Sequence, residues 1–579
     1  MKFFPSFKFS KSSFIFVTVG LFSSIWMLIR LIEKPSRIQY PCQRAAFPFV
    51  ATFLSWLAGT LVSLGLIKYV RTNKGYIINL VGLVLIVLGI TVFICSKSTI
   101  FSAEVYASEI KFNKYQFSGQ SIYLEPEATV SIVKSAKTKA DDLTEADIFE
   151  MVSEAVQLAG GLESIIQNGH TVILKPNLVL GNDDSNNPAL LPKEVNGVTT
   201  DYRVTRSVAR LVRSLNPDGK IYIIEGSGNS GYPEFSKRTT RDNFITLGYT
   251  RELIPEVDSI IALEETSSYL QFSSGNLVSI TLPDSIALYP HELKPNKSKE
   301  FYLHKIYAQA DVVISLPVLK NHIMTGPTGA VKNVGIGSSP NSIYGSGEVV
   351  GRWGANFIDH RGTNYFENLH KWIHDYYLCK PVNFAIMDGL QSSDNGPTCG
   401  DMENRLACIK NKRLILASKD AVAIDAIESI IIGQDPFKVA HLVYLANDGA
   451  GCIDPMKIKI TGEIEMDYKE SYKIAEPYNK SHDHSKYSDF TPPSIHNIQI
   501  SLNGNVIQVK CIPDVDVSRI IVKVDGFISK QQIVQNIPEF SIEANSIPTS
   551  DSKIEFYVYD SLLNCSRNIY SIKDILLQP

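Results

Sequence analysis

The sequence lacks most of the short motifs that identify a chemistry. No C-x-x-C pair occurs, so neither a zinc ribbon nor an iron–sulfur cysteine run is encoded. The G-x-S-x-G elbow of serine hydrolases, the H-E-x-x-H of zinc proteases, the kinase signature and the G-x-x-x-x-G-K-[ST] P-loop are also absent. We therefore predict no metal site and no iron–sulfur cluster held by the chain's own cysteines, and the cofactor stays unknown.

Acidic residues are almost absent from the first 100 residues, which hold eleven basic residues and a single acid, Glu33. The basic residues flank three apolar runs, at 13–32, 47–70 and 76–95. Each run is close to the ~20 residues that cross the core of a bilayer. We therefore predict a membrane domain with three transmembrane helices over 1–100, with the lipid bilayer as a partner. A cleaved signal peptide is the alternative for the first run, although no A-x-A-like site follows it.

The orientation of these helices is predicted from the basic residues in the short segments around them. With the N-terminus in the cytoplasm, six basic residues lie inside and five outside. Three spans then place the large C-terminal region outside the cytoplasm, in a multi-pass protein of the cell membrane. The six later cysteines fit an oxidising compartment, with Cys399/Cys408 and Cys511/Cys565 as the pairs to test, and isolated buried thiols are the equal alternative.

Beyond residue 100, acidic side chains outnumber basic ones. The last 479 residues hold 45 basic and 58 acidic residues, a net charge of −13. Because a nucleic-acid-binding surface is normally basic, we predict no nucleic-acid partner.

Three regions follow the predicted membrane domain. Over 120–455, short apolar runs alternate with amphipathic stretches, a pattern typical of an α/β domain with a mostly parallel sheet. We expect strands at 129–133, 171–174, 220–225, 311–315, 382–387 and 413–417, and helices at 146–158, 204–215 and 421–432. Residues 462–494 are polar and predict a linker. Residues 495–579 alternate with a period of two between turn dipeptides, which predicts an immunoglobulin-like β-sandwich.

Two predicted strand ends carry the same residue types. Lys175 and Asn177 follow one strand, and the stretch 315–337 places a second set partly on a loop and partly after a Gly/Pro/Thr turn. This second set comprises Lys320, Asn321, His322, Lys332 and Asn333, with glycines 326, 329, 335 and 337 that would let the backbone approach a ligand. Open α/β sheets bind ligands at the carboxyl ends of strands, and lysine with asparagine suits a carboxylate or phosphate. Surface lysines are the alternative for each one taken alone.

Acidic residues are expected at neighbouring strand ends. Glu225 precedes a G-x-G-x-x-G that does not open a helix at once, so Glu225 is a candidate base or ligand and dinucleotide binding is disfavoured. Asp388 follows the strand at 382–387. Asp425 lies in the helix at 421–432, which Asp420 is placed to cap.

Histidines offer two further candidates. His322 is the histidine that lies among the polar residues of the strand ends, where it could move a proton. His370 and His374 lie one helical turn apart and share a face, so they could bind a metal, but no third ligand follows from the spacing. A packed, aromatic-rich helix is the alternative.

Several of these stretches together resemble a known family. ILKPNLV (173–179), SLPVLKNH with TGAVKNVGIG (315–337), MDGL (387–390) and SKDAVAIDAI (418–427) look like the bacterial and archaeal family catalogued as domain of unknown function 362. The resemblance covers about 125–450 and implies Rossmann-like layers, with no established general activity. Many members carry ferredoxin-type modules or export signals, which implies redox or membrane partner proteins; this sequence lacks the cysteine run, which puts electron transfer through a cluster of its own in doubt. By position, the family-like residues are Lys175, Asn177, Lys320, His322, Lys332, Asn333, Asp388 and Asp425.

Our leading hypothesis is an enzyme acting on a small anionic metabolite. Lys175, Lys320 and Lys332 would orient and neutralise the anion, and Asn177 and Asn333 would hydrogen-bond it. His322 or Glu225 would move a proton, with Asp388 and Asp425 as further ligand-binding residues. The alternatives are a ligand-binding or sensory module without catalysis, and a structural surface component in which the three lysines lie far apart.

Overall fold

The computed structural model describes most of the chain beyond residue 125. The described residues are 126–178, 194, 196–226, 240–263, 276–291, 299–322, 325–339, 365–394, 396, 408–473, 490–534 and 538–576. The chain divides into two compact units, 1–115 and 116–579. The first unit lies outside the described residues, and every described element belongs to the second.

The predicted fold class has to be corrected in its membrane part. Among the described residues, no helix is both long enough and apolar enough to cross a membrane. Helix α10 (Tyr365–Cys379), the longest in the described ranges, has 15 residues, fewer than the ~20 that a bilayer requires. Three transmembrane helices are therefore not supported. The predicted spans at 13–32, 47–70 and 76–95 themselves lie outside the described residues.

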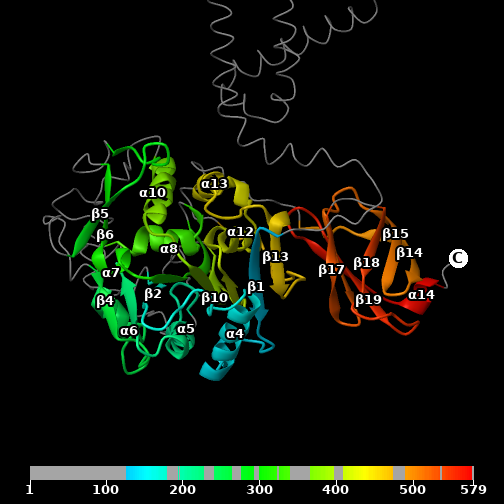
Figure 1. The fold of residues 1–579 in the computed structure, drawn as a ribbon, viewed down its shortest axis with the longest axis horizontal. Coiled ribbons are helices and arrows are strands. Elements are labelled where there is room, and N and C mark those ends of the chain that lie inside the picture. Colours follow the sequence, from blue (N-terminus) through cyan, green and yellow to red (C-terminus); the bar gives the residue numbers. More distant parts are fainter. Residues whose placement is uncertain are drawn as a thin grey trace, which may run out of the picture. The chain divides into compact units, whose positions relative to one another are not determined.

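The centre of the second unit is a mixed β-sheet (Figure 1). The strand order along its main path is β13-β1-β12-β10-β7-β2-β3-β4. Strand β12 runs antiparallel to β1 and β10, and the other neighbours along this path are parallel. The bounds are β1 Ala128–Lys134, β2 Thr171–Pro176, β3 Lys220–Glu225, β4 Ser259–Ala262, β7 Val312–Leu316, β10 Phe384–Ser393, β12 Leu414–Ser418 and β13 Ile458–Gly462. The mostly parallel sheet of the prediction is thus mixed, because β12 enters between two strands of the opposite direction.

Helices cover both faces of this sheet and close two apolar cores (Figure 1). One core is shared with α4 (Glu145–Leu158), α5 (Tyr202–Leu215) and α6 (Thr240–Thr246). The other is shared with α8 (Ala330–Gly337), α10, α12 (Ala421–Ile431) and α13 (Ala440–Asn447). Strands of parallel sheets are buried on both faces, which is why their sequences read as continuous apolar runs.

Short elements complete the α/β part. Strand β8 (Val318–His322) pairs with β10 and with β9 (Gly326–Pro327), and β11 (Ile409–Lys410) pairs with β10. Strands β5 (Leu277–Thr281) and β6 (Glu300–His304) form a separate antiparallel pair, followed by α7 (Lys305–Ala308).

Three predicted details differ in the stretch that carries the polar residues. Lys320 and His322 lie on the buried strand β8, not on a loop. Lys332, expected at a strand end, lies in the first turn of the helix α8. Strand β10 continues to Ser393, so Asp388 lies inside a strand instead of beyond its end. Lysine, asparagine and aspartate are seldom fully buried, so their presence in the sequence wrongly indicated loops.

Two antiparallel sheets form the C-terminal part. One has the order β14-β15-β18 and the other β17-β16-β19-β20, and both contribute to one apolar core. The bounds are β14 Ile495–Asn503, β15 Val506–Pro513, β16 Arg519–Val524, β17 Phe527–Val534, β18 Glu539–Glu543, β19 Lys553–Tyr559, β20 Cys565–Ser571 and α14 Ile572–Leu576. Cys565 is a free thiol, so the predicted Cys511/Cys565 bridge is wrong. Cys399 lies outside the described residues.

The C-terminal part packs on the residues just before and just after β13. Four apolar or aromatic side chains after β13 are buried in the core that α8, α10, α12 and α13 share with the sheet: Ile464, Met466, Tyr468 and Tyr472. Residues 463–473 of the predicted linker are therefore packed. Arg519 is 1% exposed and donates to the carbonyls of Pro455 at 2.6 Å and Ile458 at 3.2 Å.

Candidate functional site

Lys175 and Glu225 form a buried ion pair at the carboxyl ends of two adjacent strands. Lys175 Nζ lies 2.8 Å from Glu225 Oε1 and also donates to the Pro176 carbonyl at 2.6 Å. The Glu225 carboxylate accepts the backbone N–H groups of Leu178 and Gly226 at 2.8 and 3.0 Å. Burial lowers the pKa of Lys175 and raises the pKa of Glu225, and the ion pair opposes both shifts. Both charges are therefore used to hold the strand ends together.

Two asparagines join this pair to Lys320. Asn333 Oδ1 accepts from Lys175 Nζ at 3.2 Å and from Asn177 Nδ2 at 3.4 Å. Asn177 Oδ1 in turn accepts from Lys320 Nζ at 3.0 Å. Asn333 is fixed because its Nδ2 donates to the Lys175 carbonyl at 2.7 Å and to Ser315 Oγ at 3.1 Å. Residues from separate stretches of the sequence thus form one buried network, so the lysines are not far apart.

Lys332 is the member of this group whose amine is not engaged. It lies in the first turn of α8 and is 8% exposed, and it has no hydrogen bond or ion pair with any residue that the structure describes. Burial lowers the pKa of its amine well below the usual 10.5, the charge of Lys320 lowers it further, and Glu428 opposes the shift. A buried amine without a partner is costly, so this group is suited to meet a ligand.

Glu428 and Thr328 bracket the backbone of Lys320, and sequence reasoning missed both. Glu428 Oε1 accepts the Lys320 N–H at 3.0 Å, and the Thr328 N–H donates to the Lys320 carbonyl at 2.9 Å. Glu428 Oε2 and Thr328 Oγ1 are buried and have no hydrogen-bond partner among the described residues. Burial, with the charge of Asp425, raises the pKa of Glu428 well above 4.5. The available signal was the spacing of three from Asp425, which places both on one helix face.

Asp425 holds the start of α8. Its carboxylate accepts the N–H groups of Ala330 and Val331, and burial raises its pKa to about 7. Gly329 has φ of +65°, and a Cβ there would lie 2.3 Å from Asp425 Oδ2. A Cβ on Gly337 would likewise lie 2.6 Å from Lys175 Nζ. These two glycines make room for side chains of the chain itself.

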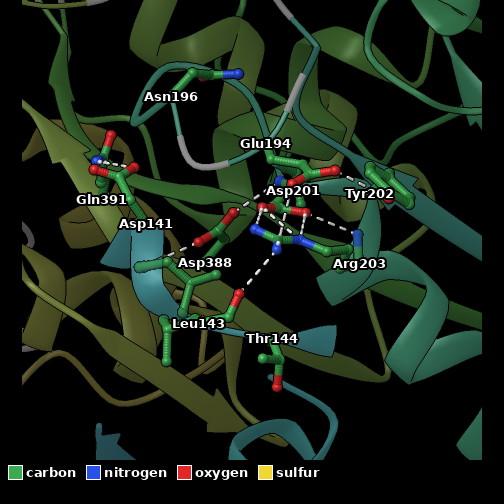
Figure 2. Close-up of polar contacts among 12 residues, drawn as sticks. Asp141, Leu143, Thr144, Glu194, Asn196, Asp201, Tyr202, Arg203, Asp388 and Gln391 are labelled. Atoms are coloured by element: carbon green, nitrogen blue, oxygen red, sulfur yellow. Dashed lines mark hydrogen bonds and ion pairs between the residues drawn. The ribbon is translucent and has the colours of Figure 1, made fainter. Parts of the chain in front are cut away.

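Asp388 belongs to a different cluster, shown in Figure 2. Its carboxylate accepts the N–H of Asp201 at 2.8 Å and of Leu390 at 3.0 Å. Asp201 caps α5 and forms an ion pair with Arg203 at 2.8 Å, and Arg203 also donates to the Leu143 carbonyl at 3.0 Å. Burial, followed by the charge of Asp201, raises the pKa of Asp388 to about 7. The contacts of Asp388 thus hold the start of α5.

The network lies within a stretch that matches a known family. Residues 172–429 match the family described as domain of unknown function (DUF362). The DUF362 match contains every member of the network, from Lys175 on β2 to Glu428 on α12, and it supports the family resemblance for this stretch. No curated protein matches the chain.

Solved structures add no argument on fold or function. The M60 catalytic domain of Clostridium perfringens ZmpC, in complex with the sialyl T antigen, is 13% identical over 25% of this chain and 28% of its own length, with a TM-score of 0.13. The C. perfringens spore cortex lytic enzyme SleM is 9% identical over 74% of this chain and 75% of its own, with a TM-score of 0.14. The chain thus spans about a quarter of the length of the first of these.

Within the DUF362 stretch, His322 ends β8 and is buried on the same strand face as Lys320. Its proton-transfer role stays a prediction.

His370 and His374, also in the DUF362 stretch, contact different groups. His370 Nδ1 lies 2.7 Å from His441 Nδ1, while His374 lies 2.7 Å from Asp375 and 2.9 Å from Asp448. Within the described ranges, no group of three or more His, Cys, Asp or Glu is placed to hold a metal ion.

Proposed function

We propose that the DUF362 stretch of this chain is an α/β enzyme that acts on a small anionic metabolite, bound at the amine of Lys332 beside Lys320. The observation that carries the proposal is the buried Lys332 amine, which has no hydrogen bond or ion pair in the described part of the chain. An anion placed there supplies both a hydrogen-bond acceptor and a compensating charge.

The balance of buried charge supports an anion instead of a cation. Lys175 and Glu225 neutralise each other in their ion pair. Lys332 lies near the cation of Lys320, and Glu428 acts on it without forming an ion pair. Asp425 is turned toward the N–H groups of α8. Among the described residues, no carboxylate is therefore in direct contact with the Lys332 amine.

The roles of the other residues follow from their contacts. Asn177 and Asn333 hold Lys320 and Lys175 in place, so their part is to position the amines. Lys320 adds positive charge beside the ligand. Glu428, with one unpartnered carboxyl oxygen, and His322, on the face of β8 that carries Lys320, are the candidates for moving a proton.

Thermal unfolding with a panel of small anions tests the proposal. The panel is acetate, pyruvate, lactate and inorganic phosphate, with acetamide as the neutral control. An anion at 100 times its Kd stabilises the folded protein by about 2.7 kcal/mol. We expect a rise in Tm for the wild type and for K419M, because Lys419 is an exposed lysine, and no rise for K332M. Equal stabilisation of K332M by the anions would overturn the assignment.

Turnover separates an enzyme from a binding module. An enzyme converts the anion that raises its Tm, whereas a sensory or binding module returns it unchanged. Incubation of the wild type with each stabilising anion, followed by mass spectrometry of the small molecules, makes this distinction.

A further inference from the structure

Polar atoms without partners gather around Lys320. They are the amine of Lys332, Oε2 of Glu428 and Oγ1 of Thr328, none of which has a hydrogen-bond partner among the described residues. These residues are 8%, 0% and 2% exposed. Buried polar groups are normally satisfied, so two unpartnered buried oxygens beside the backbone of Lys320, together with the unpartnered amine of a largely buried lysine near Lys320, indicate a site for a polar ligand. An amine, a carboxyl and a hydroxyl together can do more than hold an anion.

We infer that Lys332 is a covalent site, whose amine forms an imine with an acid that bears a carbonyl group, in the class of the 2-oxo acids, with Glu428 as the proton donor. This inference rests on the proposed function, because it names the substrate class and the chemistry of the same site.

The surroundings of Lys332 favour the neutral amine that such a reaction needs. Proteins activate a lysine nucleophile by removing it from water or by placing it beside another cation. Lys332 is buried and lies near Lys320, and both effects lower its pKa. Lys175 differs because its ion pair with Glu225 favours the charged form. Lys332 is therefore better suited to nucleophilic attack than Lys175.

The step balances without any oxidant or reductant. Lys332 Nζ adds to the carbonyl carbon, the C=O π electrons move to the oxygen, and a proton passes from nitrogen to that oxygen. The hydroxyl group then leaves as water with a proton from Glu428, whose pKa is raised by burial and by the charge of Asp425. The nitrogen lone pair forms the C=N bond, which leaves a protonated imine beside the Glu428 carboxylate. Thr328 Oγ1, which is buried without a partner among the described residues, would hydrogen-bond the substrate, and Lys320 would offer charge to its carboxylate.

Reductive trapping on the full chain tests this step. The protein is incubated with pyruvate or glyoxylate and sodium cyanoborohydride, then digested, and its peptides are mapped by mass spectrometry. We expect the Lys332 peptide of the wild type to gain the mass of pyruvic acid less one oxygen atom. K419M should label at Lys332 as the wild type does, and K332M should have no adduct on this peptide. Lactate, which has a hydroxyl in place of the carbonyl, should reduce labelling without forming an adduct.

The outcomes distinguish the two proposals. If pyruvate and lactate both raise the Tm through Lys332 but only exposed lysines are labelled, the covalent inference is overturned and the anion site stands. If the two-carbon and three-carbon oxo acids neither label Lys332 nor raise the Tm, the inference is overturned and the anion site loses its support as well. The wild-type peptide map decides this even if K332M does not fold.

Discussion

The contacts of single side chains divide the three lysines into different classes. Lys175 is paired with Glu225, Lys320 is bonded to Asn177, and Lys332 has no hydrogen-bond or ion-pair partner among the described residues. The sequence predicted that these residues would meet, because Lys and Asn recur at strand ends in one domain. The different roles of the three lysines depend on which carboxylate contacts which amine in the folded protein. Glu428 was not predictable in this way, because a glutamate on a helix normally faces water.

Breaking the Lys175–Glu225 pair should destabilise the fold. Removing one partner of a buried ion pair leaves a charge without compensation and costs about 3–5 kcal/mol. We therefore expect K175M and E225Q each to lower the free energy of unfolding by about this much, and the double variant to lose less than the sum. Urea unfolding of all three variants measures the coupling.

A surface ion pair on β3, the strand that carries Glu225, is the matched control. Lys220 of β3 pairs with Asp258 at 3.1 Å and is 58% exposed. Exposed pairs contribute about 0–1 kcal/mol, so K220M should change stability little. A loss in K175M no larger than that in K220M would contradict the assignment of a strong buried pair.

Asp388 should make the stability of the fold depend on pH. Its pKa is about 7 in the folded protein against an ordinary 3.8, so the folded state keeps a proton that the unfolded chain releases. This contribution to stability is fully present below about pH 4 and is lost as the pH rises through about 7. D388N should therefore gain stability relative to the wild type between pH 4 and pH 8, by up to about 4 kcal/mol. Unfolding curves of D388N and the wild type at pH 4 and pH 8 measure the gain. The same stability difference between the two proteins at both pH values would refute the prediction.

Helix α8 shows why local sequence patterns predicted the site only in part. Its eight residues follow a glycine with positive φ and contain two more glycines, so local propensity favours a turn. Asp425, almost a hundred positions later, accepts the first N–H groups of this helix. Strand β8 was missed for a related reason, since its polar residues are satisfied by distant partners. The core strands and the helices α4, α5 and α12 were predictable because their apolar periodicity is local.

Gly329 should be irreplaceable at the start of α8. An alanine there would have to adopt φ +65° and ψ 169°, a combination open essentially to glycine alone, and would place its Cβ 2.3 Å from Asp425 Oδ2. Gly449 has a similar φ of +74° with no neighbouring atom within 4 Å of the Cβ position. G449A therefore measures the cost of a positive φ without a steric clash, about 1 kcal/mol. We expect G329A to lose more than G449A in urea unfolding and to lose anion binding with it; equal losses would show that Asp425 gives way.

The α/β part and the C-terminal sheets are joined by buried polar contacts as well as by a shared core. Arg519 bonds the carbonyls of Pro455 and Ile458, and the Tyr559 hydroxyl donates to the Ile464 carbonyl at 2.8 Å. Burial lowers the pKa of Arg519 to about 10, which leaves it charged at pH 7. Composition predicted a linker over 462–494, which includes Ile464, because Tyr, Ser, Lys and Pro are frequent there. The packing of its apolar side chains depends on sheets that lie on both sides in the sequence.

Loss of Arg519 should uncouple the two parts. R519M leaves two buried carbonyls without their donor, at a cost of about 1–3 kcal/mol each. Trp372 is the last tryptophan in the chain, so tryptophan fluorescence does not report on the C-terminal sheets. Hydrogen exchange of their peptides measures the stability of those sheets. We expect faster exchange in β16 and β19 of R519M, with a smaller shift in the fluorescence transition. Arg567 provides the control, because it too joins the C-terminal sheets to a residue close to β13, Glu465, but is 41% exposed. Because exposed pairs contribute little, R567M should exchange like the wild type, and equal protection of R519M would mean that the apolar contacts alone couple the two parts.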